Sequence, residues 1–257
     1  MKPLVLLPIA ALVIGACGKG DSRAADTSRE VAGACQPVSG ADVCTWARMS
    51  GSQLVTIGAT VPIASIENSP AEAPMVWPPA AAAVIPLPAE VLAAAGVSHL
   101  TVYWEPHGHP PGAFMTPHFD FHFYSISDSA RQAIDCASKT KPDTLPAGYA
   151  MADMDIPGIG LLIGLCVPQM GMHSLPSAVA QDTTLFSSAL ILGYYDGHPI
   201  FFEPMISRAT LLERKSFGQP IPTPAGLGAG VHYPTQFEAV YDAAIPGYRI
   251  VFSGFSM

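Results

Sequence analysis

The stretch His118-Phe-Asp-Phe-His-Phe-Tyr124 alternates polar and aromatic side chains without exception. Successive side chains of a β-strand point to opposite faces, so an alternation of period two is typical of a strand rather than of a helix. The three phenylalanines then share one face, which we expect to lie in a core. The other face carries His118, Asp120, His122 and Tyr124. The stretch therefore predicts a core strand whose second face is polar.

Histidine is concentrated on and just before this strand. Only 12% of the 257 residues are charged, yet four of the eight histidines fall between His107 and His122. Neutral imidazole is the commonest protein ligand of zinc and related ions, so this clustering predicts a divalent-metal site with zinc as its expected ion. Side chains two positions apart on a strand are separated by about 7 Å, and those four apart by about 13 Å. His118 and His122 are therefore too far apart to share one ion from a straight strand, whereas Asp120 can pair with either.

We expect one metal site, assembled from this strand and several other segments. The Gly- and Pro-rich loop before the strand brings at least one of its two histidines, and the motifs Met170-Gly-Met-His173 and Phe202-Glu-Pro-Met205 complete the set. Asp120 and Glu203 are the candidate catalytic bases, and Asp120 is alternatively a ligand or the acceptor that fixes a histidine tautomer. The Tyr124 hydroxyl is a candidate donor to an oxygen at the metal. The expected metal ligands are His107, His109, His118, His122 and His173.

Each of these residues also has a plain structural interpretation. The polar face is alternatively the solvated face of an edge strand, the loop histidines are polar loop residues, and His173 and Glu203 are structural hydrogen-bonding groups. Three functions stay open. The first is a metal-dependent enzyme with hydrolytic or lyase chemistry on a small substrate in an apolar pocket. The second is a non-catalytic metal-binding or structural lipoprotein. The third is a metal-free His/Asp network, or a homo-oligomer contact, that weakens as histidines protonate near about pH 6.

The same motifs carry a resemblance to a known group of proteins. Taken together, they resemble a family of uncharacterised secreted bacterial proteins, over roughly residues 101–205. The resemblance implies that the motifs belong to one functional unit and that the protein is secreted, and it implies no particular reaction. The blocks that carry it are Gly108-His-Pro-Pro, Pro117-His-Phe-Asp-Phe-His-Phe-Tyr124, Met170-Gly-Met-His173, Gly193-Tyr-Tyr-Asp-Gly197 and Phe202-Glu-Pro-Met205.

The first residues of the chain have the pattern of an export signal. Residues 1–16 carry Lys2 and then an apolar run from Leu4 to Ile14, which is too short to span a bilayer and is typical of a secretory signal peptide. The sequence Ile14-Gly-Ala-Cys17 resembles a bacterial lipobox, in which the cysteine is lipidated; an ordinary signal peptide is the alternative. Gly18 stands where an inner-membrane retention signal places Asp. We therefore expect a lipid anchor in the outer membrane, facing the periplasm.

The cysteines after Cys17 are expected to form disulfides. Residues 17–34 are small and polar, as a lipidated tether should be, and residues 35–257 are expected to form a single domain that begins near Cys35. In an oxidising compartment an even number of cysteines indicates two disulfides, and four cysteines allow three pairings. Pairs Cys35–Cys44 and Cys136–Cys166 are favoured because both close short loops. A catalytic thiol is the alternative, and no closely spaced cysteine pairs suggest a zinc ribbon.

The pattern of the whole chain predicts a mainly β or α+β fold, with an antiparallel sandwich or open barrel and a few short helices. Asp196-Gly197 between two apolar runs predicts a hairpin, and residues 88–96 predict a helix that begins at Pro and ends at Gly. Short runs at 53–57 and 61–66 predict two strands, and the apolar segment Ile156–Val167 predicts a buried strand or core segment. A formal net charge of −8 and the lack of a basic run argue against nucleic-acid partners.

Overall fold

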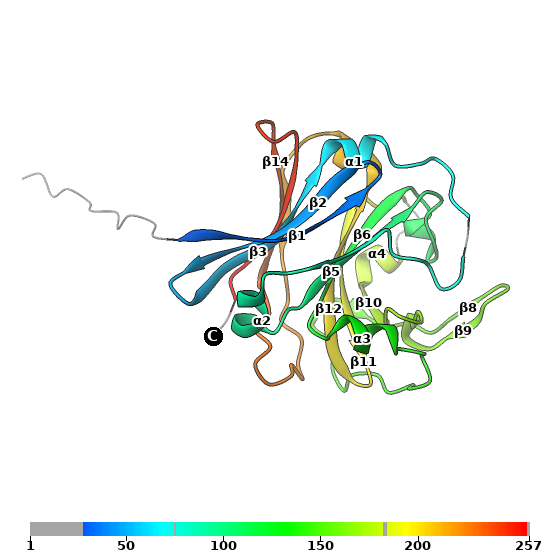
Figure 1. Cartoon of the computed structure of the whole chain (residues 1–257). Helices are drawn as coiled ribbons and strands as arrows, with labels where there is room; N and C mark the ends of the chain where they lie inside the picture. Colours follow the sequence, from blue (N-terminus) through cyan, green and yellow to red (C-terminus); the bar gives the residue numbers. More distant parts are fainter. Residues whose placement is uncertain (1–27, 75, 182–183, 256–257) are drawn as a thin grey trace, which may run out of the picture.

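The computed structural model describes residues 28–74, 76–181 and 184–255, which form two antiparallel sheets packed as a sandwich (Figure 1). The six-stranded sheet runs in the order β1 (Arg29–Val38), β2 (Ala41–Ser50), β3 (Gln53–Pro62), β15 (Gly247–Ser253), β14 (Gln236–Asp242), β13 (Phe217–Pro220). The seven-stranded sheet runs β4 (Ala83–Pro86), β5 (His99–Glu105), β6 (His118–Tyr124), β12 (His198–Ser207), β11 (Ser188–Tyr195), β10 (Met172–Pro176), β7 (Tyr149–Ala150). The predicted β-rich sandwich is confirmed, and neither sheet closes into a barrel.

The remaining elements are short. The strands β8 (Met154–Ile156) and β9 (Gly160–Leu162) form a separate hairpin. The described helices are α1 (Ile63–Glu67), α2 (Ala89–Ala95), α3 (Asp128–Gln132), α4 (Ser177–Gln181), α5 (Arg208–Leu212) and the 3₁₀ turns η1 (Gly112–Phe114) and η2 (Ile163–Leu165). None of the helices in this part of the chain has the length and apolarity needed to cross a membrane.

The aromatic face of β6 joins the two sheets, as its alternation predicts. The Phe123 ring stacks on Phe202 of β12 at 5.7 Å and meets Phe252 of β15, from the opposite sheet, edge-on at 4.8 Å. Phe119, Phe121 and Phe123 are all fully buried. Burial of one phenylalanine side chain stabilises a fold by about 1.5–3 kcal/mol. The inward face of β6 therefore anchors the core, and its other face is left for the polar residues.

A glycine in β3 shows where the pattern of apolar runs was misleading. The two strands predicted at 53–57 and 61–66 are one strand, Gln53–Pro62, followed by α1. Gly58 lies in the middle of this strand, and a Cβ there would overlap the Ile250 carbonyl and the Trp46 ring. The glycine therefore provides room for close packing across the sheet instead of a break in the strand.

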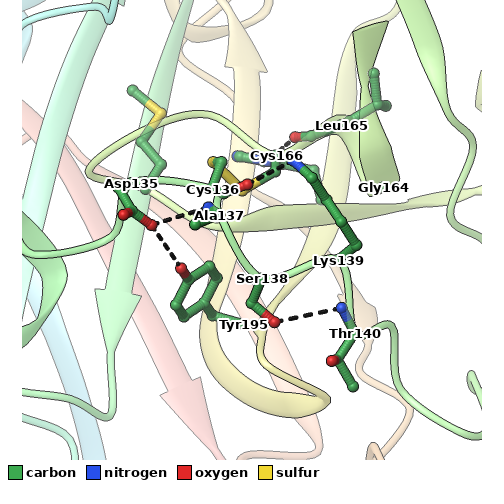
Figure 2. Close-up of a disulfide and its surroundings, with 12 residues drawn as sticks. Asp135, Cys136, Ala137, Ser138, Lys139, Thr140, Gly164, Leu165, Cys166 and Tyr195 are labelled. Atoms are coloured by element: carbon green, nitrogen blue, oxygen red, sulfur yellow. Dashed lines mark hydrogen bonds between the residues drawn. A yellow bond between two sulfur atoms is a disulfide. The ribbon is translucent and has the colours of Figure 1, made fainter.

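Both predicted disulfides are present. Cys35 and Cys44 are cross-strand partners on β1 and β2, and Cys136–Cys166 joins the segment after α3 to the end of η2 (Figure 2). Strand β1 begins at Arg29, so residues 29–34 belong to the sheet and not to a tether that reaches Cys35. The predicted signal peptide, residues 1–16, and Cys17 lie outside the described residues.

The apolar segment Ile156–Val167 is not the buried strand that its composition predicts. Most of it forms the β8–β9 hairpin, which projects from the body of the protein (Figure 1). The side chains of Ile159 and Leu161 are 40% and 61% exposed, and burial begins only at Gly164. The hairpin predicted at Asp196-Gly197 is confirmed as β11–β12, which belongs to the seven-stranded sheet itself.

Candidate metal centres and their pocket

The polar face of β6 is buried even though it does not face the sandwich core. His118, Asp120 and His122 are between 0% and 4% exposed. On β5, Glu105 pairs with His118 and Tyr103 pairs with Asp120, so this neighbouring strand contributes polar groups to the same face. A solvated edge-strand face is therefore the wrong interpretation of the alternation.

One group on this face consists of His109, His118 and Asp120. The two histidine Nε2 atoms are 3.2 Å apart, His118 Nε2 is 3.2 Å from Asp120 Oδ1, and His109 Nε2 is 3.8 Å from Asp120 Oδ2. Tetrahedral ligands with bonds of about 2.1 Å lie about 3.4 Å from one another. The two imidazole nitrogens and the Asp120 carboxylate are thus spaced as the ligands of one metal ion are.

Backbone carbonyls fix the tautomers of both histidines in this group. His118 Nδ1 lies 2.7 Å from the Thr116 carbonyl oxygen, and His109 Nδ1 lies 2.9 Å from the carbonyl oxygen of Pro110. A carbonyl only accepts, so each Nδ1 carries the proton and, in the neutral ring, each Nε2 presents a lone pair. Two lone pairs at 3.2 Å beside a carboxylate repel one another unless a cation or a proton lies between them.

Without a metal, the electrostatics of this group favour a proton on His109. Burial disfavours a charged imidazole, but the interaction with Asp120 outweighs it and raises the pKa of His109. Burial likewise acts against an ionised Asp120, yet the two histidines hold its pKa below the usual range. A divalent cation would replace that proton, because metal ligands must be deprotonated.

The second group consists of His122, His173 and Glu203. Glu203 Oε2 lies 3.4 Å from His122 Nε2 and 4.0 Å from His173 Nε2. Within the described residues, Glu203 Oε2 and both ring nitrogens of His122 are buried and have no hydrogen-bond partner. Leaving one buried polar group unpaired costs about 1–3 kcal/mol. An ion at the centre of this group would contact the unpaired oxygen and one unpaired nitrogen together.

Burial dominates the electrostatics of the second group. It lowers the pKa of His122 well below its usual value and lowers that of His173 to about 4. It also raises the pKa of Glu203 well above its ordinary value, with the charge of Asp120 adding to the effect. Burial therefore disfavours the charged form of all three groups in the metal-free protein, and a bound cation would favour the carboxylate instead.

The sheet register explains why these three residues meet. Phe202 pairs with Phe123 and Met205 pairs with Asp120, which places Glu203 opposite His122. His173 lies on β10, two strands from Glu203 on β12, and pairs with Gly193 on the intervening strand β11. The Phe201 ring occupies the space above Gly193, where a Cβ would overlap it. That ring lies 4.8 Å from the His122 ring and 5.2 Å from the His173 ring, so it bridges the two strands.

The structure divides the predicted single site into two. His118 and His122 do not share a group, as the strand spacing predicts, and His109, His173, Asp120 and Glu203 complete the two sets. The two acidic residues lie among the ligand atoms, so their predicted role as bases is not the one that their positions favour. The expectation of one shared set of ligands did not include the pairing of β6 with β12, which places Glu203 opposite His122.

Two residues predicted at the metal lie elsewhere. The exposed side chain of His107 belongs to neither group, and its Nε2 lies 3.1 Å from Glu72 Oε2. The Tyr124 hydroxyl donates to the Met170 carbonyl at 3.3 Å, so it is not directed at a metal ligand. The Tyr124 ring instead stacks on His122 at 5.8 Å and helps to hold that ring in place.

Glu105 is a residue of the site that was not identified from the sequence. It lines the same pocket as both groups, and burial, with the charge of Asp120, raises its pKa to about 7. The signal was present, because His99-Leu-Thr-Val-Tyr-Trp-Glu105 also alternates and places His99, Thr101, Tyr103 and Glu105 on one face. Reading β5 in the same way as β6 would have found it.

Both groups border one pocket with a volume of about 810 Å³. This lies within the range of about 300–1,000 Å³ that is typical of small-molecule sites. Its walls come from the polar face of the sheet and from three loop segments, 73–80, 105–115 and 156–170. The loops explain how a face outside the sandwich core becomes buried.

Comparisons with family models, with curated proteins and with solved structures find no match for this chain. The resemblance to secreted bacterial proteins therefore stays a prediction, and the site has to be interpreted from its own geometry.

Proposed function

We propose that this protein is a metal-dependent enzyme of the bacterial cell envelope, with two divalent cations bound at the floor of one pocket, zinc being the expected ion. One cation is held by His109, His118 and Asp120, and the other by His122, His173 and Glu203. The chemistry is hydrolysis, or elimination of the lyase type, on a small molecule. The observation that carries this proposal is the presence of two largely buried sets of two histidines and one carboxylate, with ligand spacing, at one pocket.

The geometry favours a cation over a hydrogen-bond network. In the first group the two Nδ1 protons are already donated to carbonyls, so neutral rings have no proton left for the short contact between their Nε2 atoms. In the second group both ring nitrogens of His122 and Glu203 Oε2 have no hydrogen-bond partner among the described residues. A network would satisfy such atoms with one another, whereas a metal site leaves them free for the ion.

The geometry also favours catalysis over a purely structural role. Structural zinc sites are closed by four protein ligands, and catalytic sites have three and keep one position open. Each group here has three candidate ligands within the described residues and borders the pocket. What a divalent cation supplies in such a position is Lewis acidity and a water molecule whose pKa falls to about 7.

Glu105 is the residue that we assign to proton transfer. Its carboxyl group lines the pocket and lies on the strand next to His118, but it belongs to neither group of ligands. Asp120 and Glu203 are better placed as ligands, because their oxygens lie within 3.2–4.0 Å of the histidine nitrogens. Glu105 can accept a proton and return it without loss of a metal ligand.

The cell envelope is proposed from the cysteines and from the first residues of the chain. Two disulfides are compatible with an oxidising extracellular or periplasmic compartment. A lipid on Cys17 and an outer-membrane location facing the periplasm are inferred from the lipobox-like sequence alone. Labelling of the protein with a radioactive fatty acid in a bacterial host, with Cys17→Ser as control, tests the anchor.

Metal stoichiometry tests the proposal directly. Protein purified without a histidine tag, equilibrated with zinc and dialysed, should contain about two zinc ions per chain by elemental analysis. His118→Ala and His122→Ala should each lose one ion, and His107→Ala, at the same pocket but outside both groups, should lose none. Less than one ion per chain in the parent protein, or equal loss in all three variants, would contradict the proposal.

A further inference from the structure

The mouth of the pocket is apolar. Three loops surround it and contribute side chains that are large, hydrophobic and unusually exposed: Val76 is 53% exposed, Trp77 42%, Met115 51% and Ile159 40%. Isolated exposed hydrophobic residues are common, but a set that lines one cavity indicates a binding site. These four residues are continuous with the buried wall formed by Phe114, Leu165 and other apolar residues of the pocket.

The polar groups of the pocket are confined to its floor and one edge. Among the described lining residues there is no Lys, Arg, Ser, Thr, Asn, Gln or Tyr. Apart from the indoles of Trp77 and Trp104, the second of which donates to the Pro70 carbonyl, the polar side chains are His107, Glu105 and members of the two metal groups. A sugar, a nucleotide or a peptide would bury many donors and acceptors that these walls cannot pair, at a cost for each.

The charge of the floor selects the polar end of the ligand. Each proposed divalent cation is offset by only one carboxylate, Asp120 or Glu203, so each group carries a net positive charge. The described lining provides no other cation. Oxygen atoms of a carboxylate or of an ester carbonyl are suited to the open position of such a metal group.

We infer that the pocket binds an acyl compound, with its carboxylate or ester oxygens at the two metal groups and its apolar chain along the wall that leads to Val76, Trp77 and Ile159. This inference rests on the proposed function for the polar end of the ligand, and on the pocket wall alone for the chain. It names the substrate class of the same site, namely a carboxylic ester or a related acyl derivative.

Binding of saturated carboxylates of increasing length tests whether the apolar chain of the ligand is buried in the pocket. Hexanoate, octanoate and decanoate are titrated by calorimetry into the zinc-equilibrated full chain, below their aggregation concentrations. Full burial of one methylene strengthens binding by about fourfold. We expect the affinity to rise at least tenfold from hexanoate to decanoate. Equal affinities for the three would overturn the inference.

A charge placed at the pocket mouth tests where the apolar chain of the ligand lies. Ile159→Glu should weaken decanoate binding at least tenfold, because the chain would pass a carboxylate. Leu92→Glu is the matched control, since Leu92 on α2 is 56% exposed and does not line the pocket. It should change the affinity less than twofold. Equal effects of the two variants would overturn the inference, as would binding of the protein to phosphatidylglycerol vesicles through Ile159 without any affinity for decanoate.

Decanol separates the polar end from the chain. Zinc-equilibrated protein should bind decanoate at least tenfold more tightly than decanol, and EDTA should remove this preference. Equal binding of the two ligands by protein that contains two zinc ions would overturn the assignment of the polar end while leaving the metal sites intact. Failure of the metal sites is recognised independently, by elemental analysis.

Discussion

His173 Nδ1 donates a hydrogen bond of 3.0 Å to the carbonyl oxygen of Leu165. This bond fixes the tautomer that directs Nε2 toward Glu203. Leu165 has a φ of 51°, a left-handed conformation that is uncommon for a leucine, and the disulfide Cys136–Cys166 holds the next residue (Figure 2). The second candidate metal group therefore depends on a loop that a disulfide keeps in place.

Removal of this disulfide should weaken metal binding at the second group only. The double substitution Cys136→Ser/Cys166→Ser frees the Leu165 carbonyl to move, and loss of such a tautomer-fixing partner typically costs 10–100-fold in metal affinity. Competitive titration with a zinc chelator should show one weakened site and one unchanged site.

The other disulfide provides the matched control. Cys35→Ser/Cys44→Ser removes a cross-strand bond in the six-stranded sheet, and neither cysteine lines the pocket. Both zinc affinities should stay unchanged in this variant at a temperature where it remains folded. If the two double variants bind zinc equally well, the His173–Leu165 contact does not position the ligand.

His99 should make the stability of the fold depend on pH. Burial, only partly opposed by Asp128, lowers its pKa from 6.5 to about 4. Because the unfolded chain takes up the proton at the higher pKa, the neutral ring contributes stability that is complete above pH 6.5 and is lost as the pH falls toward 4. At pH 5 the loss from this residue is about 1–2 kcal/mol.

The variant His99→Phe tests this assignment, since an aromatic ring can retain the stacking on Tyr124 at 5.0 Å. Urea unfolding in EDTA at pH 7.5 and pH 5 gives the free energy of unfolding. The difference between the two pH values should be about 1–2 kcal/mol smaller in His99→Phe than in the parent. An unchanged difference would mean that other groups cause the acid sensitivity.

The local part of this site could be predicted from the sequence, and the long-range part could not. Alternation along β6 identifies the polar face, and strand geometry correctly separates His118 from His122. The partners of these two residues depend on the pairing of β6 with β12 and on the position of β10, which no local pattern encodes. For this reason most of the candidate residues do lie close to one another, but in two groups and not in the single set that the sequence predicts.

Burial was the second property that the sequence did not reveal. The polar face of β6 lies outside the sandwich core, and only the fold of the loops over it shows that it is buried. The apolar segment Ile156–Val167 led to the opposite error. Its hydrophobic residues suggested a core position, but several of them lie in the exposed hairpin at the pocket mouth, where apolar surface is suited to binding.

Glu203→Gln should separate metal binding from stability. In EDTA burial disfavours the charged form of Glu203 and raises its pKa, so an uncharged amide of similar shape should change the free energy of unfolding by less than about 1 kcal/mol. With zinc at 100 times the dissociation constant, one site contributes about 2.7 kcal/mol of stability. The variant should lose this contribution of the second site and keep that of the first.

Thermal or urea unfolding of the parent and of Glu203→Gln, each with zinc and with EDTA, provides the four stabilities that this comparison requires. Asp120→Asn should give the complementary loss at the first group. A stabilising effect of zinc that is equal in the parent and in Glu203→Gln would remove Glu203 from the list of ligands.

Gly193→Ala should disrupt the second group without touching any ligand. The added methyl group would overlap the Phe201 ring, which packs against both His122 and His173, so the ring has to move. Overpacking of this kind typically costs about 1–3 kcal/mol of stability. We expect this destabilisation together with loss of one zinc ion per chain, measured by urea unfolding and elemental analysis.

Gly112→Ala is the control, because nothing lies within 4 Å of its added methyl group and its φ is not positive; it should change neither quantity. Retention of two zinc ions by Gly193→Ala would show that Phe201 does not set the spacing of the two histidines.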